Sequence, residues 1–291
     1  MDNSLASWLR LRECADTAAR SASVTRAITS VIGAGKSVKV LDLATGTGSN
    51  LRFLVPRLSG RQSWLVVDRD PTVLAEVQAR TSAWGAPRRY EVRADAGGFI
   101  IYGDRLECKV ETRQLDLGNL DELNMFAGRD IVTASALLDL VSETWLATLV
   151  AGCKAVGAAG LFAMTYNGYS CCSPLEPEDD MVRNLLNRHQ KTDKGLGGQA
   201  AGPAAAECAV RAFAEAGYRV RTAPSDWTLG SGERELQHQL IEGWAEAATA
   251  MAPGDAEQVK RWRGRRLAHV EADRSRLVVG HLDVAAWLPR D

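Results

Sequence analysis

A short segment near the N-terminus, VKVLDLATGTGSNLR at residues 38–52, has the residue types needed to bind a nucleotide-sized ligand. Its aliphatic first part has strand character and ends in an acid, Asp42. A turn rich in glycine and threonine follows, and Ser49 can cap a helix that begins near Asn50. Glycines let the backbone approach a ligand closely, and a helix start offers it unpaired N–H groups. We therefore expect a ligand cradle here; the alternative is a glycine turn that holds no ligand.

Acids also follow the next two expected strands. Asp68 ends a strand expected at 63–67, and Asp116 follows a strand that forms the second limb of a hairpin between Gly97 and Leu117. Ligands of an open α/β sheet bind outside the carboxyl ends of its strands. A carboxylate after one strand is often only a helix cap, whereas acids after three strands favour a binding edge. Asp68 is placed to accept hydrogen bonds from two ribose hydroxyls.

The glycine turn does not match the dinucleotide pattern G-x-G-x-x-G, because Ala44 replaces the first glycine and Leu51 the third. What remains is a strand, an acid and then A-x-G-x-G. This pattern resembles the first motif of class I S-adenosylmethionine (SAM)-dependent methyltransferases, with Ala44 as its one departure. The resemblance covers about residues 36–165. It implies SAM as the cofactor and S-adenosylhomocysteine (SAH) as its product.

The resemblance also implies roles for particular residues. Asp116, in QLDL, is similar to the family acid that meets the adenine amino group, and SALLDL after the fourth strand is similar to the segment that borders the SAM cleft. An arginine of the N-terminal helices could pair with the cofactor carboxylate; Arg10, Arg12 and Arg20 are available, and Arg52 competes. The expected cofactor-binding residues are Asp42, Ala44, Thr45, Gly46, Gly48, Asn50, Asp68, Asp116, Leu117, Ser135, Leu137 and Arg20.

Methyl transfer from a sulfonium needs alignment, exclusion of water and, for some acceptors, a base. The candidate catalytic residues are His189, Asp139 and Tyr166. His189 is the preferred base because it lies in a polar, glycine-containing stretch; a solvated loop histidine is the alternative. Tyr166 could equally serve in loop packing. No metal site is expected, because the four histidines lie far apart and no C-x-x-C pair occurs.

Alternating strands and helices predict an α/β fold with a doubly wound, mostly parallel sheet. Seven strands are expected, and the family resemblance implies that the last of them runs antiparallel. The chain is divided into an N-terminal helical element at 1–35 and a methyltransferase domain at 36–291. Two insertions at the ligand edge are expected in that domain: a long loop at 166–203 and a helical lid at 232–275.

Composition restricts the partners of the protein. The 291 residues carry a net charge of −1, so no overall electrostatic attraction to nucleic acid or to an anionic membrane is expected. Neither a signal peptide nor a long apolar run is visible, and six irregularly spaced cysteines favour reduced thiols. These features predict a soluble cytoplasmic protein. The basic segment KRWRGRR at 260–266 could contact nucleic acid, but the net charge and the lack of a second basic segment argue against this partner. A small anionic substrate would use the same arginines.

The predicted function is SAM-dependent transfer of a methyl group to O or N of a small-molecule acceptor by in-line displacement. One alternative is aminopropyl transfer on the same fold, which would require an acid-rich pocket for a polyamine. A second is a non-catalytic SAM-binding protein whose pocket lacks a base. Methylation of RNA or DNA is the least favoured, because the fourth strand ends in SALLDL rather than in the [DN]-P-P-[YF] segment of base-amine methyltransferases.

Overall fold

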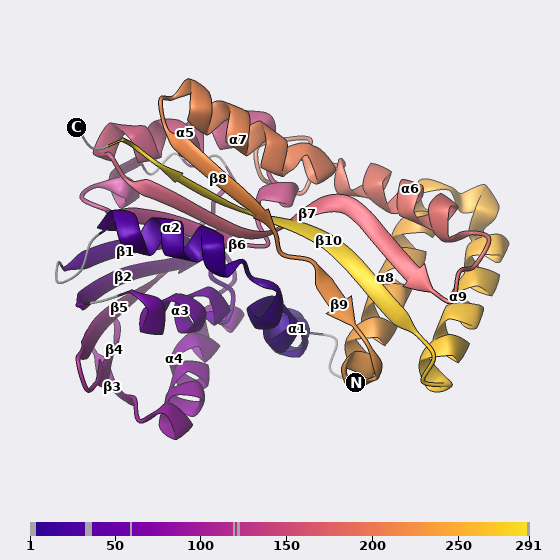
Figure 1. Cartoon of the computed structure of the whole chain (residues 1–291), viewed down its shortest axis with the longest axis horizontal. Coiled ribbons are helices and arrows are strands. Elements are labelled where there is room, and N and C mark those ends of the chain that lie inside the picture. The colour runs from indigo at the N-terminus through magenta and orange to yellow at the C-terminus, as the bar shows by residue number, and fades with distance from the viewer. Residues whose placement is uncertain (1–3, 33–36, 59, 119, 121–122, 290–291) are drawn as a thin grey trace.

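A single sheet runs through the computed structural model, which describes residues 4–32, 37–58, 60–118, 120 and 123–289 (Figure 1). Ten strands are found in this part of the chain, in the order β3-β4-β5-β2-β1-β6-β7-β10-β8, with β9 paired to β10. The strands are β1 (Val38–Leu43), β2 (Arg61–Asp68), β3 (Glu91–Asp95), β4 (Gly98–Gly103), β5 (Leu106–Gln114), β6 (Ile131–Ser135), β7 (Ala159–Ser173), β8 (Arg219–Pro224), β9 (Trp227–Leu229) and β10 (Arg276–Trp287).

The central strands β5, β2, β1, β6 and β7 run parallel to one another, whereas β10 runs antiparallel to both β7 and β8. The predicted α/β fold with an antiparallel last strand is therefore confirmed. The sheet has more strands than the seven expected. The expected hairpin adds β4, and β3 and β9 extend the sheet further. Strand β3 (EVRAD) is short and mostly polar, so its residues show little strand character.

Nine α-helices are present in the described residues. They are α1 (Leu5–Ala19), α2 (Ala22–Ile32), α3 (Ser49–Leu54), α4 (Pro71–Gly85), α5 (Glu143–Val156), α6 (Asp179–Gln190), α7 (Ala205–Glu215), α8 (Arg234–Met251) and α9 (Ala256–Glu271). Asp70 caps α4 as expected, with Pro71 at the first helical position. Ser49 was expected to cap α3, but the cap is Gly48 in a left-handed conformation. None of the described helices is long and apolar enough to cross a membrane.

Alternate residues of β1 supply two separate cores, as a doubly wound sheet requires. Leu41 and Leu43 pack with α5 and α7 on one face, and Val38 and Val40 pack with α2, α3 and α4 on the other. Both cores bury side chains of β2 by the same alternation. A strand that is apolar on both faces is typical of the middle of a parallel sheet.

The stretch 166–203, expected to be a long loop, is mostly regular structure. Strand β7 continues to Ser173, where Arg276 of β10 pairs with it, and α6 follows at 179–190. The sequence YNGYSCC at 166–172 contains polar and glycine residues, which made the strand hard to recognise. Its partner strand lies more than 100 residues further along the chain, so the pairing is invisible to local patterns.

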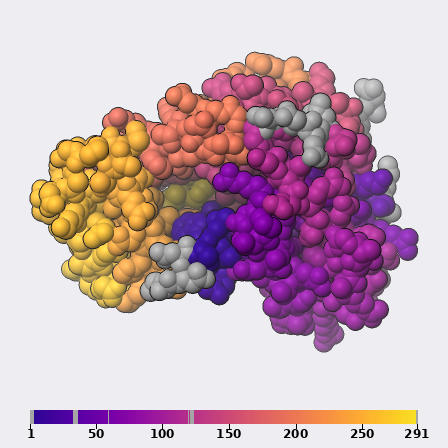
Figure 2. Space-filling model, turned by 180° about the vertical axis from the view of Figure 1, so that it is seen from behind, coloured from indigo at the N-terminus to yellow at the C-terminus, as the bar shows by residue number. Residues whose placement is uncertain are grey.

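The extension of β7 and β10 carries a lobe of three helices, α6, α8 and α9, around a third apolar core. Figure 2 shows this lobe, in orange and yellow, standing beside the remainder of the molecule, with α1 in indigo between them. The basic segment 260–266 is part of α9 in this lobe. Arg266 is fully buried and paired with Asp179, and Arg265 pairs with Glu176 and Glu178. This pairing removes cations that a nucleic-acid surface would need.

His281 of β10 is buried between two aromatic rings. Its ring centroid lies 5.0 Å from that of Trp227 and 6.2 Å from that of Tyr166. Burial, assisted by the charge of Arg12, lowers the pKa of His281 to about 3. Because the folded-state pKa lies below its usual 6.5, the stabilisation from neutral His281 is complete above pH 6.5 and is lost as the pH falls toward 3.

Replacing His281 with Phe should remove this acid sensitivity, because phenylalanine keeps a ring and carries no proton. The free energy of unfolding of the wild type, measured relative to the variant, should fall by up to ~1.4 kcal/mol per pH unit below 6.5. Urea denaturation at pH 7.5, 6.0 and 5.0 measures this difference. Asp42 and Asp139 titrate in both proteins, so their contributions cancel. A difference that stays constant with pH would show that His281 does not titrate between the two states.

Candidate functional site

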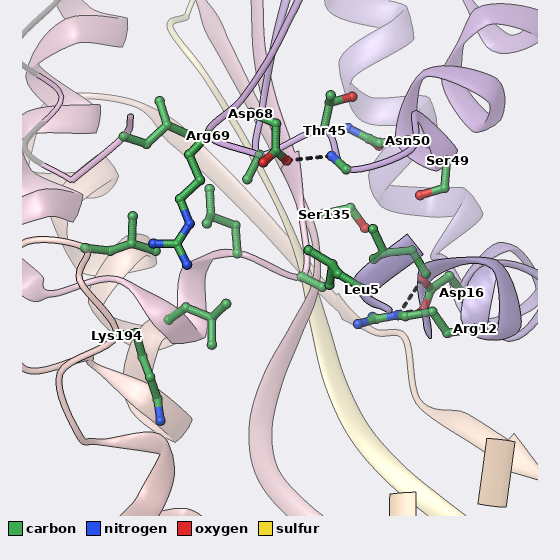
Figure 3. A pocket seen from close by; sticks show the side chains of 18 residues that line it. Leu5, Arg12, Asp16, Thr45, Ser49, Asn50, Asp68, Arg69, Ser135 and Lys194 are labelled. Atoms are coloured by element: carbon green, nitrogen blue, oxygen red, sulfur yellow. Dashed lines mark hydrogen bonds and ion pairs between the residues drawn. The ribbon is translucent and has the colours of Figure 1, made fainter. Parts of the chain in front are cut away.

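A cavity of about 400 Å³ lies at the carboxyl ends of β1, β2 and β6 (Figure 3). Its walls come from the glycine turn after β1, from α1 and from a loop that follows α6. Most of the expected cofactor-binding residues line it: Ala44, Thr45, Gly46, Asn50, Asp68, Leu117, Ser135 and Leu137. The remaining lining residues are Leu5, Leu9, Arg12, Asp16, Ser49, Arg69, Ala136, Leu140, Lys194 and Leu196.

Asp42 does not line the cavity. Its side chain is fully buried, and its two oxygens accept hydrogen bonds from Thr45 Oγ1 and Asn50 Nδ2, each at 2.6 Å. Burial raises the pKa of Asp42 to about 6, and these two hydrogen bonds oppose the rise. Asp42 therefore fixes the turn and the helix start rather than facing a ligand.

The turn itself requires residues that tolerate positive φ. Gly46 and Gly48 have φ of +55° and +84°, and a Cβ on Gly46 would lie 2.8 Å from Leu9 Cδ1. Ala44, the one departure from the family pattern, also has a positive φ of 50°. The turn is thus left-handed at Ala44 as well, although this conformation costs a residue other than glycine roughly 1–2 kcal/mol of conformational free energy.

Asp68 faces the cavity and also holds the turn in place. Its Oδ2 accepts a hydrogen bond from the Gly46 N–H at 2.8 Å, drawn as a dashed line in Figure 3, and its Oδ1 accepts one from the Asp70 N–H at 3.0 Å. A carboxylate has about four acceptor sites, so two bonds to the backbone leave capacity for a ligand. Asp116 lies in an adjoining groove beside Arg69 and accepts the Gly118 N–H.

Helix α1 forms the wall opposite the loop that follows α6, a role that the sequence suggested only through its arginines. Arg12 and Asp16 form a bidentate ion pair at 2.9 and 3.1 Å, and Trp227 of β9 donates to Asp16 at 3.0 Å. The Arg12 guanidinium lies over the Trp227 ring, 4.9 Å from its centroid. The sequence signal for this ion pair was the i,i+4 spacing of Arg12 and Asp16 on one face of a helix.

Arg20, the expected carboxylate partner, is not among the lining residues. It is buried against the Phe53 ring and donates to Asn50 Oδ1 at 2.5 Å, while its Nε and Nη2 have no partner. Burial lowers the pKa of Arg20 to about 10. The structure thus brings Arg12, rather than Arg20, to the cavity wall.

None of the three candidate catalytic residues lines the cavity. Asp139 is 6% exposed, and its Oδ1 has no hydrogen-bond partner. Tyr166 donates its hydroxyl proton to Asn187 at 2.8 Å, and burial raises its pKa. His189 lies in the last turn of α6 rather than in a loop, and burial and Lys194 lower its pKa. Burial raises the pKa of Asp139 to about 6, against the opposing charges of Arg12 and Lys194, which both line the cavity.

No protein-family model and no curated protein matches this sequence. Solved structures resemble it at low identity. A putative methyltransferase from Bacillus halodurans is 14% identical, with a TM-score of 0.49 over 92% of this chain and 100% of that one. A SAM-dependent methyltransferase from Geobacter sulfurreducens, solved with SAH, is 15% identical, with a TM-score of 0.44 over 97% and 98%. A cyclopropane synthase from Mycobacterium tuberculosis is 12% identical, with a TM-score of 0.44 over 90% and 83%.

Replacing Asp16 with Ala should loosen α1, because Arg12 and Trp227 both lose their hydrogen-bond partner. A bond to a charged group contributes roughly 1.5–3 kcal/mol, so local opening should become about tenfold or more easier. Amide hydrogen exchange of residues 5–19, followed by mass spectrometry, measures the change. Arg10→Met on the exposed side of the same helix is the matched control. Equal exchange in both variants would show that α1 is held in place by other contacts.

Proposed function

We propose that this chain is a SAM-dependent methyltransferase that acts on O or N of a small molecule. The observation that carries the proposal is the cavity at the carboxyl ends of β1, β2 and β6, which combines a left-handed glycine turn with Asp68. Ligands of open α/β sheets bind at this edge. The sequence motif and the position of the cavity therefore point to the same ligand.

The residues present fit SAM. Asp68 would accept hydrogen bonds from ribose hydroxyls, and Leu117 offers an apolar surface for the adenine ring, with Asp116 in the adjoining groove for its amino group. For the cofactor carboxylate we keep Arg20, which has two buried nitrogens without partners and is bonded to Asn50 of the cavity wall. Arg12 is the second candidate because it lines the cavity.

SAM, when bound, would supply an electrophilic methyl group attached to a sulfonium. The chain has to align the acceptor with that group and exclude water. Leu137, Leu140 and Leu196 give the cavity an apolar wall suited to both tasks. A polyamine would need an acid-rich pocket, whereas Arg12, Arg69 and Lys194 outnumber Asp16 and Asp68 among the lining residues.

For acceptors that must lose a proton, we propose Asp139 as the base. It is the candidate with an unpartnered oxygen, and a pKa near 6 suits a base that works close to neutral pH. The cations that act on it, Arg12 and Lys194, belong to the cavity wall. His189 and Tyr166 remain the other two candidates.

The small-molecule acceptor and the cytoplasmic location remain proposals drawn from the sequence. Ion pairing of the basic segment 260–266 inside the helical lobe supports a small molecule over nucleic acid. The division into an N-terminal helical element and a methyltransferase domain is likewise kept as a prediction. Incubation with methyl-labelled SAM and a small-molecule extract of the source cells, followed by chromatography, tests the function. Label transferred to no compound, despite SAH binding, would favour the non-catalytic alternative.

Replacing Asp68 with Ala should weaken SAH binding about tenfold or more. The variant loses hydrogen bonds from the ribose to a charged acceptor, worth roughly 1.5–3 kcal/mol, and it frees the Gly46 N–H. Isothermal titration calorimetry measures the affinity. Asp70→Ala, which removes only the cap of α4, controls for general loosening of this region. Unchanged affinity in Asp68→Ala would exclude Asp68 as the ribose ligand.

Replacing Asp139 with Asn should lower kcat by roughly 10²–10⁴, the usual contribution of a general base, and leave SAH affinity unchanged. With an acceptor that loses a proton, wild-type kcat should rise with pH through about 6, because Asp139 must be ionised to take the proton. Asp139→Asn should lose this dependence. His189→Gln, tested alongside, would identify His189 as the base if it alone loses activity.

A further inference from the structure

Lys194 is a cation on the cavity wall that has no acidic partner. Its Nζ donates to the backbone oxygen of His189 at 3.0 Å and to Thr192 Oγ1 at 2.9 Å, and both acceptors are neutral. No carboxylate in the described part of the chain forms an ion pair with it. Partial burial lowers the pKa of Lys194, and the charge of Asp139, which forms no ion pair with it, opposes this shift without cancelling it.

The loop that carries Lys194 is held in place on both sides of it. The Gly195 N–H donates to Asp193 Oδ1 at 2.7 Å, and the Ser142 N–H donates to the Leu196 oxygen at 3.0 Å. Asp193 and Gln199 close the loop through an isolated β-bridge. Lys194 is thus presented to the cavity by a fixed backbone, which reduces the entropy that a bound ligand would cost.

The charges around the cavity are unevenly distributed. Arg12 is paired with Asp16 on α1, whereas neither Arg69 nor Lys194 pairs with a carboxylate within the described ranges. Figure 3 shows Arg69 and Lys194 on one side of the cavity and the Arg12–Asp16 pair on the other. Arg69 Nη1 lies 3.8 Å from the place of a Cβ on Gly195, next to Lys194. One wall therefore carries two positive charges without acidic partners.

We propose that Lys194 binds an acidic group of the methyl acceptor, which makes the acceptor a small organic acid. This inference rests on the proposed methyltransferase function. An anion in the cavity would give the ammonium a directly bonded counter-charge, through a charge-assisted hydrogen bond, which no carboxylate of the described residues supplies. Leu137, Leu140 and Leu196 would contact the apolar part of such an acid. The cofactor carboxylate has its own candidates: Arg12, on the opposite side of the cavity (Figure 3), and Arg20, which is bonded to Asn50.

The test compares acids with their neutral amides on the protein saturated with SAH. Calorimetry with benzoate and benzamide, phenylacetate and phenylacetamide, and hexanoate and hexanamide separates charge from shape. At least one acid should bind the wild type about tenfold more tightly than its amide. Lys194→Met, which keeps the length of the side chain, should bind that acid no better than the amide. Lys191→Met is the matched control, because Lys191 is exposed, lies three residues away and does not line the cavity.

Each outcome has a separate meaning. A preference for the acid that disappears in Lys194→Met and persists in Lys191→Met supports the proposal. The absence of any preference in the wild type, or a preference that survives in Lys194→Met, overturns it. SAH is titrated into the same three proteins first. Failure of the wild type to bind SAH would contradict the proposed function itself, whereas normal SAH binding without discrimination between acid and amide contradicts only this inference.

Discussion

The buried carboxylate of Asp42 is the constraint on which the ligand edge of the sheet depends. A buried ion needs hydrogen-bond donors in place of water, and Thr45 and Asn50 each donate to one oxygen of Asp42. Asn50 in turn binds Thr133 of β6 and Arg20, so one carboxylate ties β1, the glycine turn, the start of α3 and the chain before α2 together. These hydrogen bonds hold the cradle in place, and Asp68 holds Gly46 from the adjacent strand.

Helix α1 connects this cradle to the helical lobe through two adjacent faces. Leu5, Leu9, Arg12 and Asp16 face the cavity, while Trp8, Leu11, Ala15 and Ala19 pack against the core of the lobe. Asp16 is its one buried residue, so polar contacts contribute a large share of its attachment. Any shift of the lobe is expected to move one wall of the cavity, because Trp227 and Asp16 are bonded to each other.

The sequence predicted the elements whose signals are local. The strand and glycine turn at 38–48, the Asp70-Pro71 helix start and the hairpin are found as expected, and eight of the twelve expected cofactor residues line one cavity. The antiparallel last strand, which the family resemblance implied, is also present. The extension of β7 past Thr165 depends on pairing with β10, a non-local interaction that residue patterns do not encode. Asp16 was missed because its partner Trp227 lies 211 residues away. Lys194 was missed because its bonds are local, and only the fold brings it to a cavity lined by residues far away in the sequence.

The expected helical lid, residues 232–275, does not line the cavity. Neither α8 nor α9 supplies a lining residue to the cavity. Both helices pack on the extended strands beside β9, where Trp227 binds Asp16 of α1. These helices can therefore influence the site only indirectly, through α1, which α8 contacts, or through α6, whose following loop supplies Lys194 and Leu196 to the cavity wall. Within the lobe, the buried Arg266 of α9 pairs with Asp179 of α6 and so holds these two helices together.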